Sequence, residues 1–206
     1  TGLFYPRVAP AQSAMTVPQD KRTHPKDPEG MGKSALAIWW QSKSPIFRFL
    51  AGFVSLMVLF YAFYYSPLYE QFIMERLLGL QARLANAMLH LIGHKTEAIG
   101  DHLVGPDFRV SIKGGCDGLE ATALYMSAVM AFPFALAREK CRGLLSGVLI
   151  LSILNLFRIA GLYLAGIYWK AGFEFLHLHG GVILFTLIAI SMWLFWVARI
   201  RSKLLS

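Results

Sequence analysis

The sequence is short of charged residues and of cysteine. Charged residues make up 16% of its 206 positions and hydrophobic residues 56%, and the mean hydropathy is +0.50. A soluble globular domain of this length is less apolar, so that class is excluded. The two cysteines stand far apart and without clustered histidines, which argues against a zinc site, and no cofactor is expected.

The chain contains several long apolar runs. A helix needs about 20 apolar residues to cross a bilayer. Four segments approach that length, at residues 46–65, 118–137, 144–169 and 175–198. Only Glu120 and Pro133 interrupt the second of them. The sequence therefore predicts an all-α polytopic membrane protein with about four transmembrane helices in one domain, residues 45–206.

The net charge of +8 could indicate nucleic-acid binding or a basic solvated face, but its distribution favours membrane topology. Basic residues cluster before the first span, between the second and third, and after the last. They are Lys33, Lys43 and Arg48; Arg138, Lys140 and Arg142; and Arg199, Arg201 and Lys203. The positive-inside rule places these clusters in the cytoplasm. Residues 66–116 carry as many acidic as basic residues, so we expect them outside, and no nucleic acid as a partner.

Residues 1–44 are predicted to be a disordered cytoplasmic tail. Residues 1–30 mix proline, charges and small polar residues without a hydrophobic period. The first apolar run lies too deep for a signal peptide and lacks a small-residue cleavage site. The chain opens on Thr1, and Met15 or Met31 is an alternative start.

Polar residues recur every three or four positions in residues 72–93, which predicts an amphipathic helix. Its polar stripe consists of Glu75, Arg83, His90 and His94, with Gly79 and Asn86 between them. The helix could lie in the outer interface or against the bundle. If it crossed the membrane, residues 138–142 would move outside, against the charge rule. The alternation at residues 108–113, after a turn at residues 105–107, predicts a short strand or hairpin leading to Cys116.

Cys116 is the candidate nucleophile. Two glycines precede it, and Asp117 with Glu120 forms a capping-box pattern, so the thiol stands where a helix begins. The helix dipole favours the thiolate, while the two carboxylates oppose it. Cys116 could also be an ordinary buried apolar residue. A disulfide with Cys141 is excluded if continuous helix separates them, because 25 residues of helix span about 37 Å.

Arg158 and His177 lie near the same predicted membrane face as Cys116. An arginine within an apolar helix costs about 2.5–3.5 kcal/mol on insertion scales, so it normally has a function and a partner. Asn155 lies one turn away, and Glu174 precedes His177 by three residues. In an alternative interpretation Arg158 is structural and pairs with Glu120, Glu174 or backbone carbonyls.

These three residue types suit acyl transfer. A cysteine nucleophile needs a base or cation nearby and an acid for the leaving amine, and histidine can serve as both. A guanidinium with backbone N–H groups can stabilise the tetrahedral oxyanion. We therefore predict cleavage of a peptide bond through a thioester, resolved by water or by an external amine or hydroxyl.

At these residues the chain resembles the exosortase/archaeosortase family of membrane cysteine transpeptidases. The resemblance covers roughly residues 45–200 and rests on three motifs in order, Gly115-Cys116-Asp117-Gly118-Leu119-Glu120-Ala121, Asn155-Leu156-Phe157-Arg158-Ile159 and Phe173-Glu174-Phe175-Leu176-His177 followed by Gly180-Gly181. The first motif and the small size are most similar to the exosortase H type. The family's Cys, Arg and His correspond to Cys116, Arg158 and His177. His179 is the neighbouring alternative, although the following Gly-Gly favours His177.

The resemblance implies a bacterial enzyme of the cytoplasmic (inner) membrane whose active site faces the periplasm. Its expected partners are the lipid bilayer, an unknown acceptor and exported proteins that end in a short motif, a transmembrane helix and a basic cluster. The resemblance implies cleavage of that sorting signal and transfer of the new C-terminus. Asn155, Glu120, Glu174 and His179 are candidates for supporting the catalytic residues. Asp117 stands where many relatives have Ser or Asn.

The main alternative is a membrane transporter or assembly subunit that uses Arg158 as an ion or lipid contact. The absence of an inverted repeat and the scarcity of intramembrane carboxylates argue against a transporter. A second alternative is a thiol peptidase that only hydrolyses its substrate.

Overall fold

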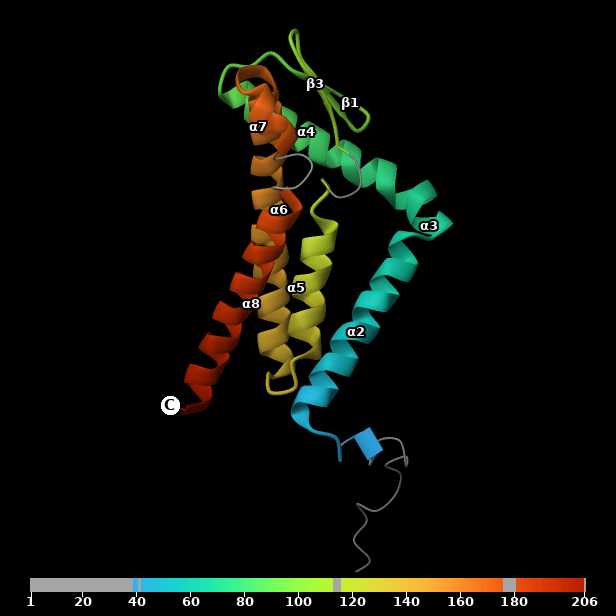
Figure 1. Ribbon diagram of the computed structural model, residues 1–206, viewed down its shortest axis with the longest axis vertical. Coiled ribbons are helices and arrows are strands. Elements are labelled where there is room, and N and C mark those ends of the chain that lie inside the picture. The colour runs from blue at the N-terminus through green and yellow to red at the C-terminus, as the bar shows by residue number, and fades with distance from the viewer. Residues whose placement is uncertain (1–38, 41, 113–115, 176–180, 206) are drawn as a thin grey trace, which may run out of the picture. The chain divides into compact units, whose positions relative to one another are not determined.

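Four helices form the main bundle of the chain. The computed structural model describes residues 39–40, 42–112, 116–175 and 181–205, and from Trp40 onward these belong to one unit, Trp40–Ser206. The bundle helices are α2 (Pro45–Tyr64), α5 (Leu119–Ala131), α6 (Ala137–Tyr168) and α8 (Gly181–Leu205). Helix α5 packs against the other three (Figure 1). Helices α2, α6 and α8 are long and apolar enough to cross a bilayer, so the predicted helical membrane fold is confirmed.

Helices α5 and α6 have different bounds from the spans predicted at residues 118–137 and 144–169. Helix α5 has 13 residues, because Phe132 is extended ahead of Pro133. The Nζ of Lys140 donates to the carbonyl oxygen of Met130 at 2.7 Å and so caps the end of α5. Helix α6 begins before its apolar run, at Ala137, because the intervening basic residues continue the helix.

The predicted amphipathic segment is helical and lies across the bundle end at which α5 begins (Figure 1). It comprises α3 (Pro67–Tyr69), the π-helical turn η2 (Glu70–Met74) and α4 (Glu75–Leu91). One face of α4 is buried through Leu78, Ala82, Ala85 and Leu89, at the three- and four-residue spacing of a helix stripe. That face packs on α6 and on a small sheet.

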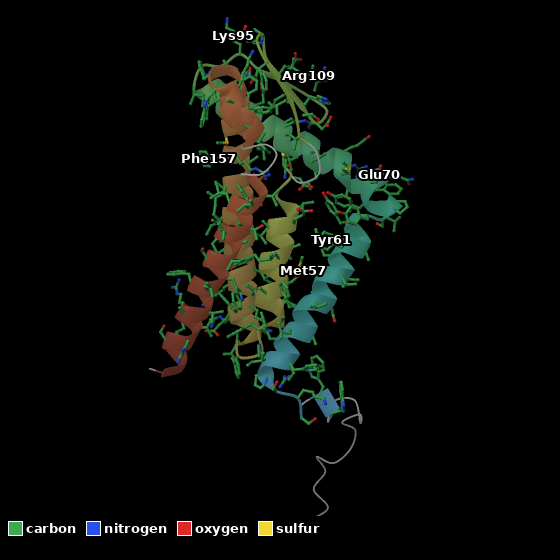
Figure 2. The ribbon with its side chains drawn as sticks, viewed as in Figure 1. Met57, Tyr61, Glu70, Lys95, Arg109 and Phe157 are labelled. Atoms are coloured by element: carbon green, nitrogen blue, oxygen red, sulfur yellow. The ribbon has the colours of Figure 1, made fainter. Side chains whose placement is uncertain are left out.

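The sheet has three antiparallel strands in the order β1 (Glu97–Ile99), β2 (His102–Val104) and β3 (Arg109–Ser111). The predicted hairpin is β2–β3, closed by a hydrogen bond from the Gly105 N–H to the Phe108 carbonyl at 2.9 Å. Strand β1 was not predicted from the sequence. Lys95 and Arg109 extend from the end of the unit that carries the sheet (Figure 2).

Two hydrophobic clusters hold these layers together. The outer cluster joins α4, the sheet and the last part of α6, and the bundle cluster joins α5, the middle of α6 and α8. Buried members of the outer cluster include Leu78, Leu89, Leu103, Val110, Ile112, Ile159 and Tyr163. Buried members of the bundle cluster are Ala121, Tyr125, Val129, Leu151, Phe185 and Ala189. Because α6 contributes to both, residues 152–158 of α6 lie between them along the chain.

Candidate active site

Cys116 lies in the connection between β3 and α5, where the two hydrophobic clusters meet along the chain. Its side chain is 7% exposed. Ile112, before it, belongs to the outer cluster, and Ala121, after it, belongs to the bundle cluster. In the chain, Cys116 thus stands between a residue of each hydrophobic cluster, and it is itself buried.

Arg158 reaches this thiol from α6. Its Nη2 lies 3.7 Å from the Sγ of Cys116, within hydrogen-bonding distance for sulfur. The neighbouring Phe157 extends from α6 away from α5 (Figure 2) and is 59% exposed. The guanidinium carbon of Arg158 also lies 5.1 Å from the centroid of the Phe185 ring on α8, a cation–π distance. Three separate segments therefore meet at the guanidinium.

The first residue of α8 must be small for this arrangement. A Cβ atom placed on Gly181 would lie 2.2 Å from Nη2 and 2.6 Å from Cζ of Arg158. The backbone of α8 therefore approaches the guanidinium as closely as only glycine allows. This close approach explains why the second residue of the Gly180-Gly181 pair in the sequence motif is glycine.

Asp117 ties the cysteine connection to the rest of the protein. Its side chain is 3% exposed and accepts hydrogen bonds from the Tyr64 hydroxyl at 3.1 Å and the Leu119 N–H at 3.2 Å. Its carbonyl oxygen accepts from the Nε2 of Gln81 on α4 at 2.9 Å. One residue thus links α2, α4 and the start of α5 directly beside the thiol.

The predicted capping box is wrong in register. Gly118, not Asp117, is the N-cap of α5, in a left-handed conformation with φ +73°. The Asp117 carboxylate still satisfies the Leu119 N–H from one position earlier. Within the described part of the chain, the Glu120 side chain returns no hydrogen bond to the cap. It borders a small cavity of about 20 Å³ together with Asp117, Gly118, Arg158 and Phe185.

Burial and charge act in opposite directions on the thiol. Burial raises the pKa of Cys116 above its ordinary value, Arg158 lowers that pKa, and Asp117 raises it. Burial also raises the pKa of the Asp117 carboxyl, against the hydrogen bonds from Leu119 and Tyr64. Burial therefore disfavours the thiolate of Cys116, and Arg158 is the group that favours it.

The structure brings together some of the predicted site residues. Cys116 and Arg158 are in contact, Asn155 packs against Gly118, and Glu120 borders the same cavity as Arg158. Glu174 lies in α7 (Lys170–Phe175), with its side chain outside the described parts. His177 and His179 lie outside the described residues. Across the described ranges, no group of three His, Cys, Asp or Glu residues could hold a metal ion.

Three contacts of the site were not predicted. Tyr64 belongs to the first predicted span, residues 46–65, with no contact expected of it, yet its hydroxyl donates a hydrogen bond to Asp117. Gln81 lies on the predicted amphipathic helix but not in its polar stripe, and Phe185 is one of many apolar residues of the last span. The polar character of Gln81 is the one signal that could have marked it.

A multi-pass membrane fold and a buried thiol held against an intramembrane arginine define an integral membrane protein with a candidate cysteine site. Residues 34–194 match the family described as transmembrane exosortase. This match covers well over half of the chain, so the protein belongs to the transmembrane exosortase family. No curated protein and no solved structure is significantly similar to it.

Proposed function

We propose that this exosortase is a membrane cysteine transpeptidase that cleaves C-terminal sorting signals of exported proteins. The observation that carries the proposal is the 3.7 Å contact between Arg158 Nη2 and Cys116 Sγ, in a chain of this family. A thiol beside a permanent cation is the setting in which a cysteine can act as a nucleophile.

The reaction proceeds by acyl transfer. The Cys116 thiolate attacks the carbonyl carbon of the scissile peptide bond, and the negative charge of the tetrahedral intermediate falls on the carbonyl oxygen. Arg158 lies close enough to the sulfur to stabilise that oxyanion, a contribution that typically amounts to about 10²–10³ in rate for one donor. The C–N bond then breaks and leaves a thioester on Cys116. An acceptor amine, hydroxyl or water attacks the thioester and regenerates the thiol.

His177 is the proposed acid and base of this sequence. It takes the proton of Cys116 and gives it to the leaving amine. The proposal rests on the family resemblance and on Gly181, which follows His177 by four residues in the chain and contacts Arg158. His179 is the neighbouring alternative.

The proposed substrate is an exported protein that ends in a short motif, a transmembrane helix and a basic cluster. The site would face the periplasmic side of the cytoplasmic membrane, because basic residues gather at the opposite ends of the bundle helices. Arg138 and Arg142 begin α6, and Arg199 and Lys203 end α8.

Processing of such a substrate in cells that carry Cys116→Ala tests the proposal. We expect C116A to insert into the membrane and to leave a co-expressed substrate at its precursor size. Cys141→Ala is the matched control, because Cys141 is exposed, and it should process normally. Normal processing by inserted C116A would rule out the thioester mechanism. The mass of the product C-terminus separates transfer from hydrolysis.

A further inference from the structure

Asn155 buries an amide that has no hydrogen-bond partner. It is 2% exposed, and throughout the described residues neither its Nδ2 nor its Oδ1 finds a partner. Buried polar groups of folded proteins are almost always hydrogen-bonded, because leaving one unpaired is costly. A leucine of nearly the same shape would fill this position in an apolar helix without that cost. The amide therefore calls for a role beyond packing.

The unpaired amide lies beside the cysteine connection. A Cβ atom placed on Gly118 would lie 2.8 Å from Cγ and 3.0 Å from Oδ1 of Asn155. Gly118 follows Cys116 by two residues, and Asn155 precedes Arg158 by three, about one turn of α6. The amide is thus held between the backbone after the thiol and the helix that carries the guanidinium.

The chemistry of the amide complements that of its neighbours. The Arg158 guanidinium can only donate hydrogen bonds, whereas an asparagine side chain both donates and accepts. A carboxamide therefore matches one residue of an extended backbone, whose N–H and C=O point to the same side and can be bound at the same time. The acceptor function of Oδ1 is the property that Arg158 lacks.

We infer that Asn155 binds the backbone of one substrate residue next to the scissile bond. Its Oδ1 accepts the N–H of that residue and its Nδ2 donates to the carbonyl oxygen of the same residue. This inference rests on the proposed function, since it requires a peptide chain at Cys116. If so, the position beside the thiol recognises the extended backbone of the substrate and not one of its side chains.

A comparison of two reagents that modify the thiol tests this assignment. Two proteins are compared, one with Cys141→Ala alone and one with Cys141→Ala and Asn155→Leu. Each is treated with acetyl-Ala-Ala chloromethyl ketone and, separately, with methyl methanethiosulfonate. The first reagent carries peptide N–H groups and the second carries none. We expect N155L to slow modification of Cys116 by the peptide ketone about five- to a hundredfold, which is the effect of two lost hydrogen bonds. Modification by the thiosulfonate should change less than twofold.

Thermal unfolding of the same variant supplies a second readout. Because the leucine removes two unpaired polar atoms, N155L should unfold at the same temperature as wild type or higher. The matched control is Asn86→Leu on α4, where the Oδ1 accepts a 2.6 Å hydrogen bond from the Thr96 hydroxyl. N86L should unfold at a lower temperature and leave both modification rates unchanged.

Three outcomes would overturn the inference. In the first, N155L slows the modification of Cys116 by both reagents equally, and in the second it slows neither modification. In the third, N155L loses thermal stability as N86L does. The first and third would show that Asn155 only positions the backbone around Cys116. The proposed function is judged separately by the processing of a substrate in C116A, so its failure is distinguishable from these results.

Discussion

At the scale of single residues, the titration of Cys116 depends on its burial and on two charged neighbours. Burial disfavours the thiolate, the Arg158 guanidinium favours it, and the Asp117 carboxylate opposes it. Removal of either charge should therefore move the titration of the thiol, and the two removals should act in opposite directions. The thiolate is the form that reacts with alkylating agents, so the titration can be measured by rate.

Arg158→Gln should shift the pH dependence of Cys116 alkylation toward higher pH, because it removes the cation that lowers the thiol pKa. Asp117→Asn should shift it toward lower pH, because it removes the charge that raises the pKa. The measurement is the rate of iodoacetamide modification against pH, followed by mass spectrometry with Cys141 replaced by Ala. Arg142→Gln, at the far end of α6, is the control and should leave the profile unchanged. Shifts of the same sign in R158Q and D117N would contradict this account.

Sequence reasoning predicted that Cys116 and Arg158 lie near one another, as their 3.7 Å contact bears out, but not the contacts of Asp117 beside them. Cys116 and Arg158 could be expected at one membrane face because apolar length and charge fix which end of each helix they occupy. The bonds of Asp117 to Tyr64 and Gln81 depend on the rotation of α2 and α4 about their axes. The weak amphipathicity of an apolar helix does not determine that rotation. The cap shifted from Asp117 to Gly118 because glycine adopts the left-handed conformation at the start of α5.

At the scale of elements, the start of α8 sets the position of the guanidinium. Gly181→Ala should displace Arg158 from Cys116, because the added methyl group would occupy the place of Nη2. Since the far end of an arginine moves readily, the protein should still insert and fold. The alkylation profile of Cys116 should shift toward higher pH, in the same direction as in R158Q.

Gly161→Ala provides the matched control for this substitution. Gly161 lies on α6, and a Cβ atom there would meet no atom within 4 Å. G161A should therefore retain the wild-type alkylation profile. A wild-type profile in G181A as well would show that α8 does not position Arg158.

The apolar runs predicted the long helices, but they did not predict strand β1 or the end of helix α5. Strand β1 contains Glu97, Ala98 and Ile99, with only the middle residue half-buried, so no alternating pattern marks it. It pairs with β2 because the chain turns back at Gly100, whose φ is +60°. Helix α5 is shorter than its apolar run because the backbone before Pro133 cannot remain helical, whatever the hydropathy.

At the scale of the whole molecule, the proposed orientation places the sheet outside and the start of α6 inside. Lys95→Cys, in a background with Cys116→Ala and Cys141→Ala, should react with a membrane-impermeant maleimide in intact spheroplasts. The native Cys141, in a C116A background, should react only in inside-out vesicles. Both positions are exposed, so access depends on the side of the membrane and not on burial. Labelling of the two positions from the same side would contradict the orientation.

Helix α2 differs from the other bundle helices because none of its residues is buried. It packs along α5, and its last residue, Tyr64, bonds to Asp117 beside the thiol. Helices with so much lipid-facing surface adjust their tilt to the thickness of the surrounding bilayer. A change in tilt would pull on the Tyr64 hydroxyl and, through it, on the carboxylate next to Cys116. We therefore expect the thickness of the surrounding membrane to affect, through α2, the environment of the buried Cys116 thiol.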